Sequence, residues 1–259
     1  MHLVLVGLNH KSASVDLREK LYFHESSLFD AYKKLMSRYS VAGCVIVSTC
    51  NRIEIYAASS EIYTAFEEIE TFIESFHSIS KNEFIRHIYK KHCEDAVSHL
   101  FRVVASLDSM VVGEYQIQGQ LRDAYTFASG HGFTNNLLNK IFQTATQVGK
   151  VIRSETGIGK GAVSIASVAV DLVRKIINEH SLKRIMIIGA GKMASLAASG
   201  LSELRDCKIV ICNRTGEKAL DLAKSVQADN IHYNDRYNAI AESDVVIVST
   251  GADHYVVTE

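Results

Sequence analysis

The sequence predicts an α/β protein in two parts: an α+β half, then a doubly wound parallel sheet that is incomplete at its C-terminal end. The chain has 259 residues, enough for two domains with sizeable cores. Hydrophobic residues make up 47% and charged residues 22%, which is the composition of a globular protein. Strands and helices alternate regularly in the last third of the chain, and that order is typical of a parallel sheet.

Apolar runs and amphipathic stretches follow each other irregularly in the first half. Short apolar runs bounded by turn residues predict strands at residues 3–8, 43–48 and 53–58. Helical spacing of apolar residues predicts helices at residues 27–39, 61–76, 82–92, 94–107, 116–129 and 135–153. This half is therefore expected to form an α+β domain of its own.

The glycine-containing segment at residues 157–161 is the best candidate for a linker. We expect a first domain over residues 1–157, a linker with a connecting helix over 158–180, and a second domain over 181–259. The connecting helix is predicted at residues 163–178. In the second domain, strands are predicted at 184–188, 208–212, near 231–233 and at 244–249, and helices at 192–204 and 217–225.

The composition excludes several classes of protein. A net charge of −1 gives no sign of a basic nucleic-acid-binding surface. The five cysteines include no C-x-x-C pair and the histidines show no ligand spacing, so we expect neither a disulfide framework nor a metal site. Apolar runs are strand-sized, and one begins almost at Met1, so no membrane span or leader peptide is expected. These features favour a cytoplasmic protein.

A dinucleotide-binding turn is predicted where the strand at 184–188 ends. The motif G-x-G-x-x-A follows the strand and opens a helix, so a pyrophosphate could sit at the helix N-terminus of a Rossmann domain. A structural glycine turn is the alternative. The predicted cofactor-binding residues of this turn are Gly189, Ala190, Gly191, Lys192, Met193 and Ala194.

The end of the next strand indicates which cofactor is bound. An NAD site usually has Asp or Glu there, whereas this chain has Asn213, Arg214 and Thr215. A guanidinium suits the 2′-phosphate of NADPH, because it donates two hydrogen bonds in a fork. NADPH is therefore favoured, with Arg214 as a solvated loop residue the alternative.

A cysteine lies in the polar turn between two predicted strands. Cys50 follows the run at 43–48, and Arg52 two residues on could supply the positive charge that favours a thiolate. Taken alone, the residue reads better as an inert buried thiol. The other four cysteines lie in or beside predicted helices and strands and keep that interpretation.

Several segments in the same order resemble the hallmark sequences of glutamyl-tRNA reductases. They are GLNHKSA at residues 7–13, STCNRIE at 48–54, AVSHL at 96–100, SLDSMVVGEYQIQGQ at 106–120, and the two cofactor segments above. The resemblance implies NADPH-dependent reduction of glutamyl-tRNA to glutamate-1-semialdehyde, the first step of tetrapyrrole biosynthesis by the five-carbon route.

The resemblance also implies roles for particular residues. Cys50 would attack the aminoacyl ester to form a thioester, and His99 would be needed for full activity. An Arg and a Glu suit the charged ends of the glutamyl group, with each partner left unassigned. The implied glutamyl-binding residues are Thr49, Asn51, Arg52, Ser109, Glu114, Tyr115, Gln116 and Gln120.

The implied partners are glutamyl-tRNA and glutamate-1-semialdehyde aminomutase, which would take over the product. The family forms homodimers through a C-terminal helical region. That region is missing here, so the chain is expected to be truncated within its cofactor domain and monomeric. Two residues depart from the family pattern: Ser14 and Tyr115 stand where the family usually has proline.

Two other functions stay open. An NADP-dependent oxidoreductase of the shikimate dehydrogenase type also pairs a glycine-rich turn with Asn-Arg-Thr, but it leaves the turn at residues 49–52 without a role. A non-catalytic tRNA-binding protein would be expected to lack the nucleophile, and Cys50 is present.

Overall fold

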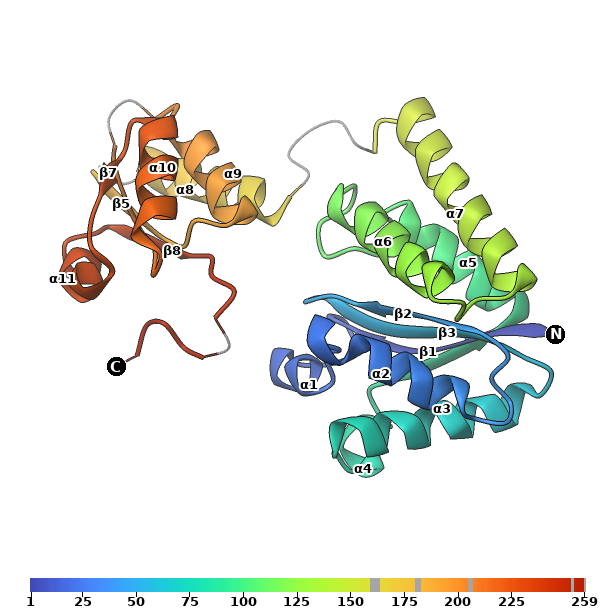
Figure 1. The fold of residues 1–259 in the computed structure, drawn as a ribbon. Coiled ribbons are helices and arrows are strands. Elements are labelled where there is room, and N and C mark those ends of the chain that lie inside the picture. Colours follow the sequence, from blue (N-terminus) through green and yellow to red (C-terminus); the bar gives the residue numbers. More distant parts are fainter. Residues whose placement is uncertain (159–163, 180–182, 205–206, 253, 259) are drawn as a thin grey trace. The chain divides into compact units, whose positions relative to one another are not determined.

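The computed structural model describes residues 1–158, 164–179, 183–204, 207–252 and 254–258. The chain divides into two compact units, Met1–Gly161 and Ala162–Glu259 (Figure 1). Part of the predicted linker, residues 159–161, lies outside the described residues. The finer division at residues 157 and 180 stays a prediction.

The first unit is built on a four-stranded antiparallel sheet. Its strands are β1 (His2–Asn9), β2 (Cys44–Ser48), β3 (Arg52–Ser59) and β4 (Tyr89–His92), in the order β2-β3-β1-β4. Strands β2 and β3 form a hairpin in which Ser48 is opposite Ile53, so residues 49–51 make the turn. The predicted Cys50 therefore lies at the tip of a hairpin.

Helices cover both faces of this sheet (Figure 1). One layer contains α1 (Val15–Lys20), α2 (Glu25–Met36), α3 (Ile62–His77) and α4 (Lys81–Phe84), and the other contains α5 (Cys93–Val104), α6 (Gln116–Gly130) and α7 (Asn136–Glu155). Because helices cover both faces, the central strands are buried on both sides, and every residue of β3 is buried. The edge strand β4 instead alternates between half-buried and exposed residues.

One predicted helix in this unit does not form, and two others, predicted to reach residues 39 and 107, end at Met36 and Val104. Residues 82–92 do not form one helix, since α4 ends at Phe84 and Tyr89–His92 is strand β4. This strand pairs with β1, placing Tyr89 opposite Gly7 and His92 opposite Val4. The apolar spacing in this segment resembles a helix, but backbone pairing with the edge of β1 decides its conformation. Helix α1 was not predicted.

The second unit contains a parallel sheet in the order β7-β6-β5-β8. Its strands are β5 (Arg184–Ile188), β6 (Lys208–Cys212), β7 (Asp229–Asn230) and β8 (Val245–Val248). Its helices are α8 (Ile165–Glu179), α9 (Lys192–Leu201), α10 (Gly216–Val226), α11 (Arg236–Ala241) and the 3₁₀ turn η1 (Tyr233–Asp235). This strand order confirms the predicted doubly wound sheet.

Small corrections apply to this unit. The strand predicted near residues 231–233 lies at Asp229–Asn230, the helix predicted to reach residue 204 ends at Leu201, and α11 was not predicted. The start predicted for the connecting helix, residue 163, lies outside the described residues. None of the helices in the described ranges combines the length and apolar character needed to cross a bilayer.

Candidate active site

The hairpin turn that carries Cys50 is held by hydrogen bonds that involve the Thr49 hydroxyl and backbone groups of the turn. The Thr49 Oγ1 accepts from the backbone N–H of Asn51 at 3.3 Å and of Arg52 at 3.1 Å, and the Thr49 N–H donates to the Arg52 carbonyl at 2.8 Å. The N–H of His10 donates to the Asn51 carbonyl at 2.9 Å. Thr49 and Asn51 therefore shape the turn itself.

Cys50 is the exposed cysteine among the five. Cys44 and Cys212 are buried, and burial raises the pKa of both thiols, that of Cys212 to about 11. Desolvation of the thiol and the nearby Glu114 carboxylate raise the pKa of Cys50, while the charge of Arg18 lowers it. The predicted nucleophile is therefore accessible, and two nearby charges of opposite sign act on it.

Arg52 does not supply the positive charge that the sequence suggested for Cys50. Its side chain is 2% exposed and forms ion pairs with Glu54 at 2.8 Å and with Asp108 at 3.3 Å. Its Nη2 also donates to the Asp108 carbonyl at 2.5 Å. The cation that acts on the thiol is Arg18 of α1, which was not predicted as a site residue.

A buried carboxylate lies beneath the turn. Glu54 is fully buried and accepts four hydrogen bonds, from Arg52 Nη1 at 2.8 Å, Tyr56 Oη at 2.7 Å, Tyr89 Oη at 2.5 Å and His99 Nε2 at 2.7 Å. Desolvation alone would raise the pKa of Glu54, but the Arg52 charge and the hydrogen bonds from His99 and Tyr89 outweigh it and lower the pKa to about 2.

The sequence contained a signal for this network that we missed. Arg52, Glu54 and Tyr56 alternate along an apolar strand, so their side chains lie on one face. A charged residue in a buried strand needs a partner, and here the two partners are neighbours on that face. The contribution of Tyr89 could not be found this way, because its strand was expected to be a helix.

His99 enters the site through Glu54 rather than through Cys50. It lies on α5, its ring is 5.2 Å from that of Tyr89, and its Nε2 contacts the Glu54 carboxylate. The structure therefore joins His99 to the predicted pocket residue Arg52 by way of one shared carboxylate.

The segment at residues 106–115 packs against this network. Asp108 accepts from Lys11 Nζ at 2.6 Å and from Arg52, and desolvation is outweighed by these partners, so the pKa of Asp108 is lowered. Ser109 is buried, and its hydroxyl has no hydrogen-bond partner among the described residues. Asp108 thus connects this segment to the hairpin through Arg52.

The end of this segment is fastened to α7 by Arg153. The Arg153 Nη2 donates to the Glu114 carbonyl at 2.9 Å, and its guanidinium stacks on the Tyr115 ring at 4.3 Å. Glu114 itself is buried, while Tyr115 is exposed. Gln116 begins α6 half-buried, and Gln120 is exposed one turn later.

The predicted cofactor turn lies at the carboxyl ends of β5 and β6. Gly189 has φ +121°, and a Cβ there would lie 1.9 Å from the Ser249 carbonyl oxygen, so the turn requires glycine. Gly191 has open space above it and is the N-cap residue of α9, and Lys192 and Met193 form that helix's first turn. Ala194 is buried and packs in the core of the unit.

A cavity of about 290 Å³ joins this turn to the end of β6. It is lined by Ala190, Gly191, Asn213, Arg214, Thr215, Lys218, Tyr233, Ser249, Thr250, Gly251, Ala252, His254 and Val256. The backbone of the turn is open toward the cavity and two cations border it, so these residues fit a phosphate-bearing dinucleotide. Lys218 was not predicted.

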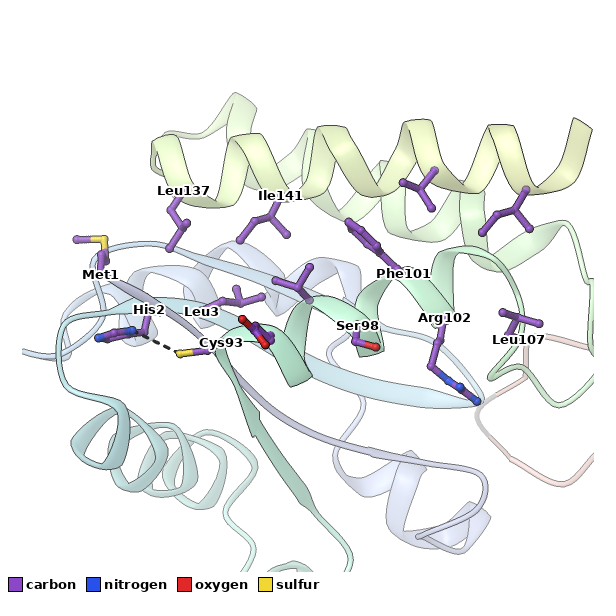
Figure 2. A pocket seen from close by; sticks show the side chains of 14 residues that line it. Met1, His2, Leu3, Cys93, Ser98, Phe101, Arg102, Leu107, Leu137 and Ile141 are labelled. Atoms are coloured by element: carbon purple, nitrogen blue, oxygen red, sulfur yellow. Dashed lines mark hydrogen bonds between the residues drawn. The ribbon is translucent and has the colours of Figure 1, made fainter. Parts of the chain in front are cut away.

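A larger cavity in the first unit is separate from these sites. It has a volume of about 750 Å³ and is lined mainly by apolar residues of α5 and α7, with none of the predicted site residues among them. Figure 2 shows Phe101, Leu137 and Ile141 lining it, and His2 hydrogen-bonded to Cys93 at one end, at 3.4 Å. Among the described residues, no group of three His, Cys, Asp or Glu side chains could hold a metal ion.

Fold and site together define a protein with a thiol-bearing α+β unit and a doubly wound unit for a nicotinamide cofactor. Residues 6–156 match the family described as glutamyl-tRNA(Glu) reductase, N-terminal domain, and residues 171–259 match shikimate / quinate 5-dehydrogenase. The chain therefore belongs to the glutamyl-tRNA reductase family.

Similar proteins agree with this family. The chain is 42% identical over 257 residues to the glutamyl-tRNA reductase of Carboxydothermus hydrogenoformans, and 40% identical over 257 residues to that of Geobacter sulfurreducens. These matches cover 99% of this chain but 57% and 59% of the relatives. The solved glutamyl-tRNA reductase of Methanopyrus kandleri matches 98% of this chain and 60% of its own, with 33% identity and a TM-score of 0.60.

Proposed function

We propose that this chain carries out NADPH-dependent reduction of glutamyl-tRNA to glutamate-1-semialdehyde, the first step of tetrapyrrole biosynthesis. The observation that carries the proposal is Cys50, an exposed thiol at the tip of a hairpin in the family's N-terminal domain. A cofactor cavity in the second unit supports it, because a reduction needs a hydride donor.

The proposed chemistry begins at the sulfur of Cys50. The thiolate attacks the carbonyl carbon of the aminoacyl ester, a C–S bond forms, the C–O bond to the ribose breaks, and the ribose hydroxyl leaves with a proton from solvent. NADPH supplies a hydride when bound. A thioester carbon would accept a hydride more readily than a carboxylate would, and the C–S bond would break to leave the aldehyde and the Cys50 thiolate.

The proposed glutamyl pocket surrounds this turn. Glu114 is a buried carboxylate whose charge acts on Cys50, so it lies where it could receive the α-ammonium group of the substrate. Ser109 offers a buried hydroxyl without a partner among the described residues. Arg52 would contribute to the pocket as a cation held in place by its hydrogen bond to Glu54. His99 would contribute through its own hydrogen bond to the same carboxylate. Thr49, Asn51, Tyr115, Gln116 and Gln120 stay proposed members of the pocket.

We propose NADPH rather than NADH because two cations border the cavity at the end of β6. Arg214 and Lys218 both line it beside Thr215. Replacing Arg214 with Ala should weaken NADPH binding by about 1.5–3 kcal/mol, the usual value of a hydrogen bond to a charged group, and leave NADH binding nearly unchanged. Fluorescence titration with both cofactors measures this, and equal losses would exclude a role for Arg214 in reading the 2′-phosphate.

Glutamyl-tRNA is the proposed substrate, in the cytoplasm, with hand-over of the semialdehyde to glutamate-1-semialdehyde aminomutase. A shikimate-dehydrogenase-type activity is favoured by the match over residues 171–259. That match covers the cofactor unit alone. It gives no role to the Cys50 turn, which is why we propose the reductase.

A covalent-trapping experiment tests the proposal. The chain is mixed with tRNA charged with labelled glutamate, without NADPH, and the acid-stable, hydroxylamine-labile label on protein is counted. Wild type should be labelled and Cys50→Ser should not. Cys93→Ser is the matched control, because Cys93 is half-buried while Cys44 lies in the core. Labelled Cys50→Ser protein would exclude the proposed nucleophile.

A further inference from the structure

We propose that Arg18 is the positioning residue of the nucleophile: it holds the backbone of the Cys50 turn and supplies the positive charge that favours the thiolate. The inference deepens the proposed reductase function and rests on it. It assigns to α1 a role that the sequence did not indicate.

The geometry around Arg18 is that of a fixed side chain. Arg18 is 7% exposed, although it lies on a helix of six residues. Its Nη1 donates to the backbone carbonyl of Cys50, and its Nε donates to the carbonyl of Ala13 at 3.4 Å. The guanidinium therefore joins the start of α1 to the hairpin tip, and its position relative to Cys50 is set at two points.

The cap of α1 supports this placement. Ser14 is the N-cap residue, its hydroxyl accepts from the Leu17 N–H at 3.4 Å, and its carbonyl accepts from the Arg18 N–H at 3.1 Å. Ser14 is one of the two departures from the family pattern, and here it caps the helix through its side chain. The first turn of α1 is thus defined, and Arg18 projects from it toward the hairpin.

The other cations near the turn are engaged elsewhere. Arg52 is paired with Glu54 and Asp108, and Lys11 is paired with Asp108. His10 contacts the turn through its backbone, and burial, followed by the charges of Lys11 and Arg52, lowers the pKa of its ring, which favours the neutral form. Arg18 is left as the cation whose charge acts on the thiol.

Arg18 is opposed by one carboxylate. Glu114, from the segment before α6, acts on Cys50 in the opposite direction. Two charged groups of opposite sign therefore influence the thiol: Arg18 from α1 and Glu114 from the segment between α5 and α6. Any cation that paired with Glu114 would leave Arg18 unopposed and increase the thiolate fraction.

Alkylation of the thiol as a function of pH tests the role of Arg18 without tRNA or cofactor. The full chain is treated with iodoacetamide from pH 6 to 10, and modification of Cys50 is followed by peptide mass spectrometry. Arg18→Gln should raise the midpoint pH of Cys50 alkylation by about one unit and slow alkylation at pH 7 about tenfold. A neighbouring opposite charge shifts a pKa by about 1–3 units. Glu114→Gln should lower the midpoint, and Arg18→Lys should stay close to wild type.

Matched variants separate this role from general effects. Lys20→Gln removes one positive charge from the exposed side of the same helix and should leave the midpoint unchanged. Arg18→Met keeps the packed stem without the charge and should behave like Arg18→Gln. An unchanged midpoint in folded Arg18→Gln or Arg18→Met, or loss of the fold in both, would overturn the proposal. A shifted alkylation midpoint, together with no adduct from charged tRNA, would instead support the role of Arg18 and reject the reductase function.

Discussion

At the scale of single residues, the site depends on the buried negative charge of Glu54. Glu54 is surrounded by four donors from β3, β4 and α5, so its carboxylate is fully compensated. Removing one partner of such a network leaves the remaining charges buried without compensation, which costs more than the pair contributes when intact. Glu54 therefore fixes Arg52 and His99 relative to the hairpin that carries Cys50.

Replacing Glu54 with Gln should destabilise the first unit by about 3–5 kcal/mol, because Arg52 then keeps a buried charge without its main partner. Urea unfolding followed by tyrosine fluorescence measures the loss. Glu83→Gln is the control, since Glu83 is exposed and lies 3.8 Å from Lys20 in a surface pair, and it should change little. A Glu54→Gln variant as stable as the control would show that the network contributes nothing.

The same residue predicts a pH dependence. The pKa of Glu54 falls from 4.5 to about 2 on folding, so its contribution to stability is complete above about pH 4.5 and is lost as the pH falls toward 2. Wild type should therefore lose stability more steeply than Glu54→Gln across this window. Parallel urea titrations at pH 5, 4 and 3 check the difference, and equal slopes would contradict the ionised, buried carboxylate.

At the scale of structural elements, two turns place the proposed chemistry. The β2–β3 hairpin exposes Cys50, and the β5–α9 turn exposes backbone groups to the cofactor cavity. The second turn contains two glycines that are subject to different structural constraints. Gly189 has a positive φ and no room for a Cβ, whereas Gly191 has open space where a cofactor would lie.

These two glycines should respond differently to substitution. Gly189→Ala should cost about 2 kcal/mol or more of stability, because of strain and a clash with the Ser249 carbonyl, and should also abolish NADPH binding. Gly191→Ala should leave the melting temperature unchanged but weaken NADPH binding, because its Cβ would occupy the approach of the pyrophosphate. Gly130→Ala, with open space and no positive φ, is the control. The proposed cofactor position is wrong if Gly191→Ala binds NADPH normally.

At the scale of the whole molecule, each unit has its own core. One cluster of buried side chains lies within residues 3–145, and two others lie within residues 166–256. Units with separate cores can unfold separately, so a single free energy of unfolding does not describe the chain. The proposed thiol chemistry and the proposed cofactor binding are divided between these units in the same way.

Calorimetry should therefore record two thermal transitions. NADPH at about 100 times its dissociation constant should stabilise the second unit by about 2.7 kcal/mol and leave the first where it was, because a ligand stabilises the unit that binds it. Arg214→Ala protein serves as the control, since its second transition should respond less at the same concentration. A single transition that NADPH shifts as a whole would instead mean that the units unfold together.

Local patterns in the sequence were sufficient for most elements and for the position of the glycine turn. Apolar runs gave β1, β2, β3, β5 and β6 to within about a residue, because strands buried on both faces are mostly apolar. Helices with a strong apolar face, such as α3 and α7, were placed almost as well. The glycine turn was predicted from neighbouring residues, whereas Cys50 was singled out by the resemblance of its turn to a known family and not by its local sequence alone.

Contacts between distant residues were decided by the tertiary structure. Residues 89–92 became a strand through pairing with β1, against their helical spacing. Glu54 gathers its partners from three elements, and Arg18 reaches Cys50 across 32 positions of sequence, replacing Arg52 as the neighbouring cation. Local sequence determines what conformation a segment prefers, whereas the partner of a buried charge depends on which segments the fold brings together.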